Sequence, residues 1–273
     1  MEKKKYPQLL RAFFGLLLGL VWLIPFYLML SNSFKSKQEI FTSPLKLPED
    51  FTWSNYPEAF EQLDFLKTLF NSLLITVISV VIIVIFSAMV AYALERIKSK
   101  MSSLLFMAFV AAMLVPFQSV MIPLISIFGK IEMLNQVGII FMYLGFGASM
   151  SIFLYHGALK AIPKALDEAA IIDGANRFQV FWKVIFPMLK PTTVTVALLN
   201  TMWIWNDYLL PSLVINSPET QTIPLKMFFF FGQYTKQWHL ALAGLVIAIL
   251  PVIIFYFFMQ KQIIKGVAEG SVK

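Results

Sequence analysis

The chain has 273 residues, of which 59% are hydrophobic, 15% aromatic and only 14% charged. A soluble domain carries about a quarter charged residues and cannot bury this much apolar side chain, so the composition indicates a membrane protein. It excludes a cytosolic enzyme, a secreted domain and a disordered chain. The absence of cysteine and the presence of only two histidines exclude disulfides, thiolate nucleophiles and a histidine-rich metal site.

Six long windows nearly free of charge predict six transmembrane helices, because about 20 apolar residues cross the hydrocarbon core. In chain order we expect spans at about residues 12–33, 68–94, 102–128, 134–159, 191–215 and 238–260. The first resembles a secretory signal but is longer and has no clear cleavage site, so we expect an uncleaved span. Prolines within the windows, such as Pro116, predict kinks. The predicted fold class is all-α: a polytopic membrane protein with a single domain over residues 1–273.

The lysines and arginines predict the orientation of these spans. Fifteen of them fall on the side that holds both termini, and seven fall on the other side. By the positive-inside rule, both termini and the tail 261–273 are expected in the cytoplasm. The net charge of +7 is therefore assigned to topology, and no nucleic-acid partner is expected. Loop 35–66, with six acidic residues and several aromatic ones, is expected to form an ordered external cap.

The longest predicted cytoplasmic loop, 160–190, has strong local signals. Pro163 suits a first helical turn, Gly174 suits the left-handed end of a helix, and Asn176 can cap the next one. The second helix would be amphipathic, with its apolar side formed by Phe178, Phe181, Trp182 and Ile185. Helix physics alone leaves two interpretations open: a hairpin that anchors a long loop at the interface, and a docking element.

The spacing of particular residues in this loop resembles a known family. Glu168-Ala169-Ala170 is followed at fixed intervals by Gly174, by Val184, and by Phe186-Pro187. This pattern resembles the EAA loop of importer-type ABC permeases, in which isoleucine and leucine usually stand at positions 184 and 186. Further stretches look like the sugar-permease subgroup, in particular its smaller, MalG-like member: Asn71–Leu73, Ala91–Arg96, Pro123–Leu124, Asp173–Ala175, Trp205–Asp207 and Gly266–Lys273.

The resemblance implies that the chain is the permease subunit of an ATP-driven importer and forms the pathway for a sugar or oligosaccharide. It implies a bacterial inner-membrane location and a cytoplasmic coupling helix whose ATPase-contacting residues are Glu168, Ala169, Ala170, Asp173, Gly174 and Pro187. The implied partners are a second, homologous permease forming a heterodimer, two ATPase subunits, an extracytoplasmic sugar-binding protein and the lipid bilayer. No cofactor is expected on this chain, and ATP and Mg²⁺ are expected on the ATPase subunits. The sequence has no G-x-x-x-x-G-K-[ST], so the chain itself is not expected to be an enzyme.

The fifth window contains the candidate substrate-contacting residues. Asn200, Trp203 and Asp207 share one face of a helix, with Asn206 beside it. A sugar pathway needs polar groups next to aromatic planes, and a carboxylate within a span favours a functional role. In the alternative, Asp207 lies about 24 Å along the helix from Pro191, where the outer membrane interface is hydrated. Trp203 and Trp205 would then be interfacial aromatic residues.

Two other classes of function fit a polytopic membrane protein. An ion-coupled secondary transporter of a small polar solute usually shows internal repeats and buried charges near the membrane midplane, and this chain shows neither clearly. A membrane enzyme would need a nucleophile, an acid–base pair or a metal cluster near an interface, and we find none in the sequence. The secondary transporter is the second-ranked prediction.

Overall fold

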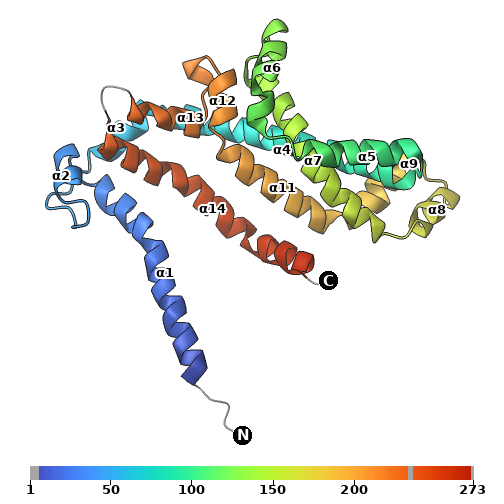
Figure 1. Ribbon diagram of the computed structural model, residues 1–273, viewed down its shortest axis with the longest axis horizontal. Coiled ribbons are helices and arrows are strands. Elements are labelled where there is room, and N and C mark those ends of the chain that lie inside the picture. The colour runs from blue at the N-terminus through green and yellow to red at the C-terminus, as the bar shows by residue number, and fades with distance from the viewer. Residues whose placement is uncertain (1–5, 233–235, 272–273) are drawn as a thin grey trace. The chain divides into compact units, whose positions relative to one another are not determined.

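The computed structural model describes residues 6–232 and 236–271, with the side chains of residues 10–232, 236–257 and 260. Within these ranges every regular element is helical (Figure 1), which confirms the predicted fold class. The chain divides into two compact units. The first comprises Met1–Phe65 and Lys226–Ile254, and the second comprises Leu66–Leu225 and Phe255–Lys273.

The first unit contains two long apolar helices and a short helical insertion. The insertion, part of the segment expected to form an ordered cap, holds two short helices. Its fold depends on Lys35, which is fully buried and donates hydrogen bonds to the side chain of Asn32 (3.0 Å) and to the carbonyls of Ser43 (2.8 Å) and Lys46 (2.6 Å). The helices are α1 (Tyr6–Ser33), α2 (Lys37–Thr42), α3 (Asn55–Gln62), a 3-10 turn (Phe228–Phe231) and the first part of α14 (Trp238–Ser271).

The second unit is built around α4 (Phe65–Arg96), α7 (Gln136–Lys160) and α11 (Lys190–Trp205). Its core consists of apolar side chains from all three helices, among them Ile83, Ile152 and Val196, each fully buried. The remaining elements are α5 (Lys100–Ala112), α6 (Phe117–Lys130), α8 (Ala165–Ile172), α9 (Arg177–Gln179), a π-helix (Val180–Ile185), α10 (Phe186–Met188), α12 (Leu209–Val214), a 3-10 turn (Pro218–Thr220) and α13 (Ile223–Met227).

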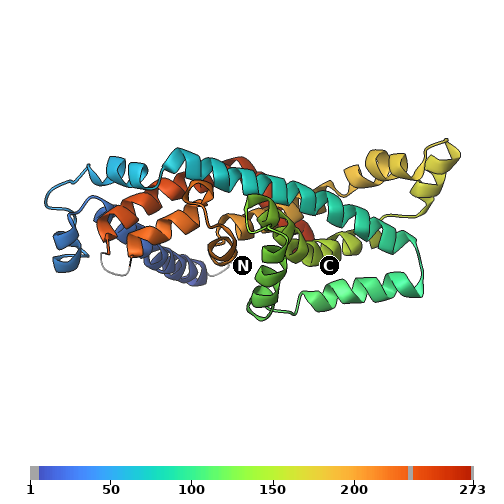
Figure 2. The same ribbon diagram turned by 90° about the horizontal axis from the view of Figure 1, so that it is seen from above.

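The three core helices pack closely because one position is glycine. A Cβ on Gly147 of α7 would lie 2.6 Å from both Oδ1 of Asn200 on α11 and Cδ1 of Ile83 on α4. Real Cβ atoms do not approach other atoms this closely, so a larger residue must displace the side chains of Asn200 and Ile83 between the helices. Figure 2 shows that α8, α9 and α10 lie near the C-terminal end of α4, which is also the end where α5 begins.

Four helices are long and apolar enough to cross a membrane: Leu10–Ser33, Phe65–Arg96, Gln136–Lys160 and Trp238–Phe257. The spans expected at 102–128 and 191–215 are not single straight helices. In the first window α5 and α6 meet at 104°, and just before the second window the helical segment Arg177–Met188 meets α11 at 77°. The described residues thus hold four to six spans, depending on whether each bent pair counts as one.

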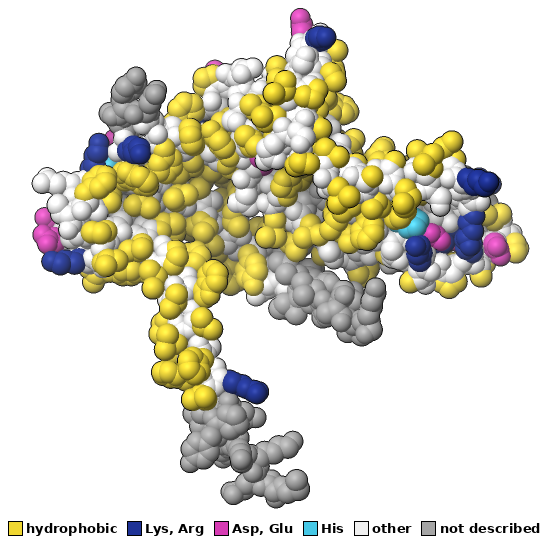
Figure 3. Space-filling view, viewed as in Figure 1, with side chains coloured by type: hydrophobic (Ala, Val, Ile, Leu, Met, Phe, Trp, Pro, Cys, Tyr) yellow, Lys and Arg dark blue, Asp and Glu magenta, His cyan; other side chains and the backbone are white. Residues whose placement is uncertain are grey.

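Proline explains where both breaks fall. Pro116 has no N–H to bond the carbonyl of Ala112, where α5 ends, and its ring would clash with that carbonyl. Pro191 acts in the same way on the turn that contains Leu189. The window 191–215 is interrupted again, because α11 ends at Trp205 and α12 begins only at Leu209. On the face shown in Figure 3, apolar side chains cover most of the long helices and charged side chains collect near helix ends.

Candidate functional site

The loop 160–190 forms a helical hairpin whose corner matches the local sequence signals. Gly174 has a φ of +87°, which confirms the predicted left-handed turn. The N–H of Ala175 bonds the carbonyl of Ala170 and the N–H of Gly174 bonds that of Ile171, the Schellman pattern that ends a helix. Beyond the corner, Asn176 caps α9 in the predicted way through a capping box. Pro163 lies just before the N-cap Lys164 rather than in the first helical turn.

Asp167 fastens the inner side of α8 to the end of α4. Its Oδ1 accepts hydrogen bonds from the Tyr92 hydroxyl (2.6 Å) and from Nε of Arg96 (3.2 Å). Its Oδ2 lies 2.9 Å from Nη2 of Arg96, an ion pair without hydrogen-bond alignment. The side chains of Arg96 and Asp167 are only 12% and 11% exposed. Arg96 also donates to the carbonyl of Ile162 (3.3 Å), so this guanidinium holds both ends of the turn that leads into α8.

The outer side of α8 is unlike the inner side. Glu168 and Ala169 are exposed, and so is Ile172, at 85% of its surface. Ala170, on the inner side, packs against the core instead. The short helix is thus fixed on one face by a buried ion pair and offers a small apolar surface with one carboxylate on the other. A surface of this kind suits a shallow groove on another protein.

The second arm of the hairpin continues from α9 through the π-helix and α10 to the start of α11. Phe181 and Ile185 are buried, whereas Phe178 is exposed, so the expected apolar side is only partly buried. Aromatic rings connect this arm to α4, because Phe181 lies 5.3 Å from the ring of Tyr92. A single π-helical turn at such a junction is often associated with a functional site. Pro187 begins the last helical turn of the arm, before the 77° bend.

The candidate pathway residues of α11 face α7. Asn200 is buried and its Nδ2 donates to Oγ of Ser151 (3.1 Å) and to the carbonyl of Val196 (2.8 Å). The ring of Trp203 packs edge-on against Tyr143, with 5.4 Å between centroids, and is 41% exposed. The two side chains thus lie on one face, as the spacing predicts. Of the two, Trp203 is the one that remains accessible.

Asp207 lies beyond the end of α11 and joins three segments. Its Oδ2 accepts a hydrogen bond from the Tyr143 hydroxyl (3.0 Å), and its Oδ1 accepts from the backbone N–H groups of Leu209 (3.0 Å) and Leu210 (3.4 Å). It therefore stabilises the first turn of α12 and ties that turn to α7. Asn206 does not join this group, because its amide donates to the carbonyl of Met202 one turn back (2.7 Å).

Sequence reasoning missed the partners of these residues. Tyr92 and Arg96 are one turn apart at the end of α4, a spacing that puts both on one face, but nothing local to them indicates Asp167. The sequence around Asp167 does not distinguish it from Asp173, the other aspartate of this hairpin corner. The structure distinguishes them, because Asp173 is exposed and Asp167 is buried.

Comparisons with known proteins agree with this arrangement. Residues 83–269 match the family model described as "Binding-protein-dependent transport system inner membrane component". The chain is 54% identical over 273 residues to the probable starch degradation products transport system permease protein AmyC of Thermoanaerobacterium thermosulfurigenes, with 100% of both chains covered. It is 35% identical over 260 residues to the multiple sugar-binding transport system permease protein MsmG of Streptococcus mutans, with 93% of each covered.

A solved structure supports the same relationship. A chain of a bacterial ABC transporter involved in the import of the acidic polysaccharide alginate matches with a TM-score of 0.77 and 25% sequence identity, over 96% of this chain and 99% of that one. The family model covers most of the described second unit, including the hairpin with Glu168 and the face with Trp203. The chain therefore belongs to the family of binding-protein-dependent transport system inner membrane components.

Proposed function

We propose that the chain is a permease subunit of an ATP-driven importer and forms part of the membrane pathway for a sugar or oligosaccharide. Family membership supports transport, and the names of the two relatives, which refer to starch degradation products and to multiple sugars, support a carbohydrate substrate. The family assignment gives no support to the alternative of an ion-coupled secondary transporter.

The coupling role is supported by the difference between the two sides of α8. A buried ion pair fixes its inner side to α4, while Glu168, Ala169 and Ile172 are exposed on its outer side. A push on the outer side would be transmitted to α4 through Asp167 and Arg96, because both charged groups are held in place. We assign the outer side to the contact with an ATPase subunit, with Ala170, Asp173, Gly174 and Pro187 shaping the hairpin that presents it.

The partners of the chain follow from this role. ATP and Mg²⁺ would bind to two ATPase subunits, since the chain has no phosphate-binding loop. A second permease would complete the pathway, and an extracytoplasmic binding protein would deliver the sugar. Clustered basic residues near the hairpin, among them Arg96, Lys160 and Lys164, support placing this end of the unit in the cytoplasm, together with both chain termini.

The coupling role is tested by replacing residues 163–176 with a Gly/Ser linker of equal length. The spans should still insert, because the core of the second unit lies in α4, α7 and α11, but the ATPase subunits should no longer copurify and uptake should stop. Uptake at the wild-type rate with the linker in place would refute this assignment.

A second proposal concerns the pathway. Asn200, Trp203 and Asp207 would belong to its wall, with Trp203 offering its exposed ring to the sugar. Asp207 would hold Tyr143, the neighbour of that ring, and Asn200 would join α11 to Ser151 of α7. The protein has no native cysteine, so Trp203→Cys gives a single labelling site. Protection of this cysteine by the transported sugar is the expected result. If it stays unreactive toward aqueous reagents in every nucleotide state, the face belongs to a helix interface.

A further inference from the structure

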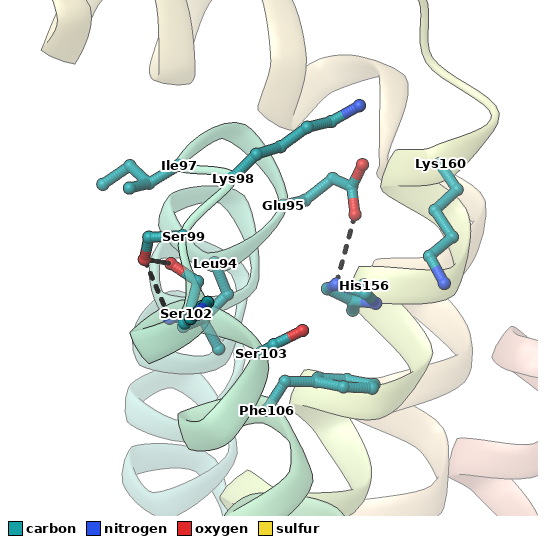
Figure 4. A pocket seen from close by; sticks show the side chains of 11 residues that line it. Leu94, Glu95, Ile97, Lys98, Ser99, Ser102, Ser103, Phe106, His156 and Lys160 are labelled. Carbon is teal, nitrogen blue, oxygen red and sulfur yellow. Dashed lines mark hydrogen bonds and ion pairs between the residues drawn. The ribbon is translucent and has the colours of Figure 1, made fainter.

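A pocket with both charged and apolar lining residues opens between the ends of α4, α5 and α7 in the second unit. It has a volume of about 520 Å³. Three lysines line it: Lys98 just after α4, Lys100 at the start of α5 and Lys160 at the end of α7. Figure 4 shows Lys98 above Glu95 and Lys160 to the right of His156, with Ser103 and Phe106 below them. The proposed function makes no use of this pocket.

The pocket has an excess of positive charge. Lys98, Lys100 and Lys160 are exposed, and within the described part of the chain none of them forms an ion pair. The acidic residue of the lining, Glu95, is engaged by His156, whose Nε2 lies 3.1 Å from its Oε2 (Figure 4). Three lysines against one glutamate leave the lining with a net positive charge, which favours an anion.

Other groups around the pocket also favour an anion. Helix α5 begins here, and its first turn has no acidic residue, so the positive end of its dipole is not neutralised by a carboxylate. Ser99 caps this end through a bond from the N–H of Ser102 (3.0 Å), and the hydroxyl of Ser103 faces the pocket. Hydroxyl and ammonium groups that line one pocket can donate hydrogen bonds to the oxygens of a phosphate.

The surroundings of the pocket distinguish a lipid phosphate from a free one. The floor is apolar, because Phe106 stacks on the His156 ring with 4.0 Å between centroids. An exposed apolar surface continues from this floor, because Phe153 of α7 is 45% exposed and its ring stacks on Phe106 with 6.4 Å between centroids, and Met107, one turn after Ser103, is 64% exposed. A headgroup in the pocket would let acyl chains lie along this surface, whereas a free anion would gain nothing from it.

We propose that this pocket binds the phosphate-bearing headgroup of an anionic phospholipid, with its acyl chains along the exposed apolar surface formed by Phe153 and Met107. The pocket joins three span ends on the side assigned to the cytoplasm, where basic pockets between helices commonly recognise such lipids. The bound lipid would connect the α4–α5 turn to the end of α7, next to the ion pair that holds α8. This inference depends on the proposed topology for the leaflet but not on the identity of the transported solute.

The test measures phosphatidylglycerol binding to the purified full chain by native mass spectrometry. Each lysine near an anionic lipid contributes about a fivefold gain in affinity, so Lys98→Gln/Lys160→Gln should weaken the tightest site roughly thirtyfold. The matched control is Lys183→Gln/Lys190→Gln, which removes two exposed charges on the same predicted side but outside the pocket. This control should bind the lipid as the wild type does.

Two further arms identify the ligand. Phosphatidylcholine should not occupy the site, and inorganic phosphate at the same concentration should not displace phosphatidylglycerol. Lys98→Arg/Lys160→Arg should restore binding, which shows that the glutamine variant loses charge and not its fold. Equal binding by the pocket and control variants, equal binding of phosphatidylcholine, displacement by inorganic phosphate or failure of the arginine variant would each overturn the proposal. ATP-dependent uptake by the wild type tests the proposed transport function separately.

Discussion

The substitution Asp167→Asn tests how firmly α8 is attached to the rest of the second unit. It keeps the shape of the side chain, but it removes the charge and places an amide group against Nη2 of Arg96, which now lies 2.9 Å from a carboxylate oxygen. Removing one partner of a buried ion pair typically costs about 3–5 kcal/mol. Because both side chains remain about a tenth exposed, we take the lower end, about 3 kcal/mol, which corresponds to roughly a hundredfold change in an equilibrium constant.

This cost should appear locally, because the interaction holds one short helix and does not contribute to the core. Hydrogen exchange in lipid nanodiscs should show amides of α8 exchanging up to roughly a hundred times faster, while amides in the middle of α7 keep their protection. Asp173→Asn is the matched control, since it is an exposed aspartate at the end of the same helix. The double variant Arg96→Gln/Asp167→Asn should cost less than the two single changes together. Unchanged exchange in α8 of Asp167→Asn would refute the reasoning.

Three further substitutions should have defined effects. Gly147→Val should lower the melting temperature of the protein and its yield, because the new side chain meets Asn200 at 2.6 Å from its Cβ; Gly145→Val, with open space around it, is the control. Gly174→Val should lower uptake by about tenfold or more without loss of insertion, because a β-branched residue opposes a φ of +87°; normal uptake contradicts this. Lys35→Met should speed proteolysis of residues 36–54, because the carbonyl of Ser43 loses its donor; an unchanged cleavage rate argues against that role.

Local signals predicted the hairpin well, while contacts between distant segments were not predictable. Gly174 and Asn176 determine the corner of the hairpin through their own backbone conformation and side chain, so inspection of a few neighbouring residues was enough. The bond between Asp167 and Arg96 joins residues 71 positions apart, and that between Tyr143 and Asp207 joins residues 64 apart. No pattern within one helix indicates which distant side chain it will meet.

Hydropathy had a comparable limit for the spans. It reports how apolar a window is and not the direction of its axis, so it gave the window 102–128 as one span. Pro116 indicated where this window bends, because its missing N–H and its ring act on the preceding turn. The angle of 104° between α5 and α6 depends on how each helix packs, which the sequence of the window does not specify.

The central claim, that the outer side of α8 docks an ATPase subunit, is tested most directly by the affinity of the membrane subunit for that ATPase. Glu168 is exposed beside Ala169 and Ile172. When a carboxylate is paired with a basic residue across an interface, truncating it typically costs about 2–5 kcal/mol of binding free energy. Glu168→Ala should therefore weaken ATPase binding by at least roughly thirtyfold, and Asp173→Ala should weaken it less. ATPase binding by Glu168→Ala that equals the wild type, measured in the same membranes, would contradict the account.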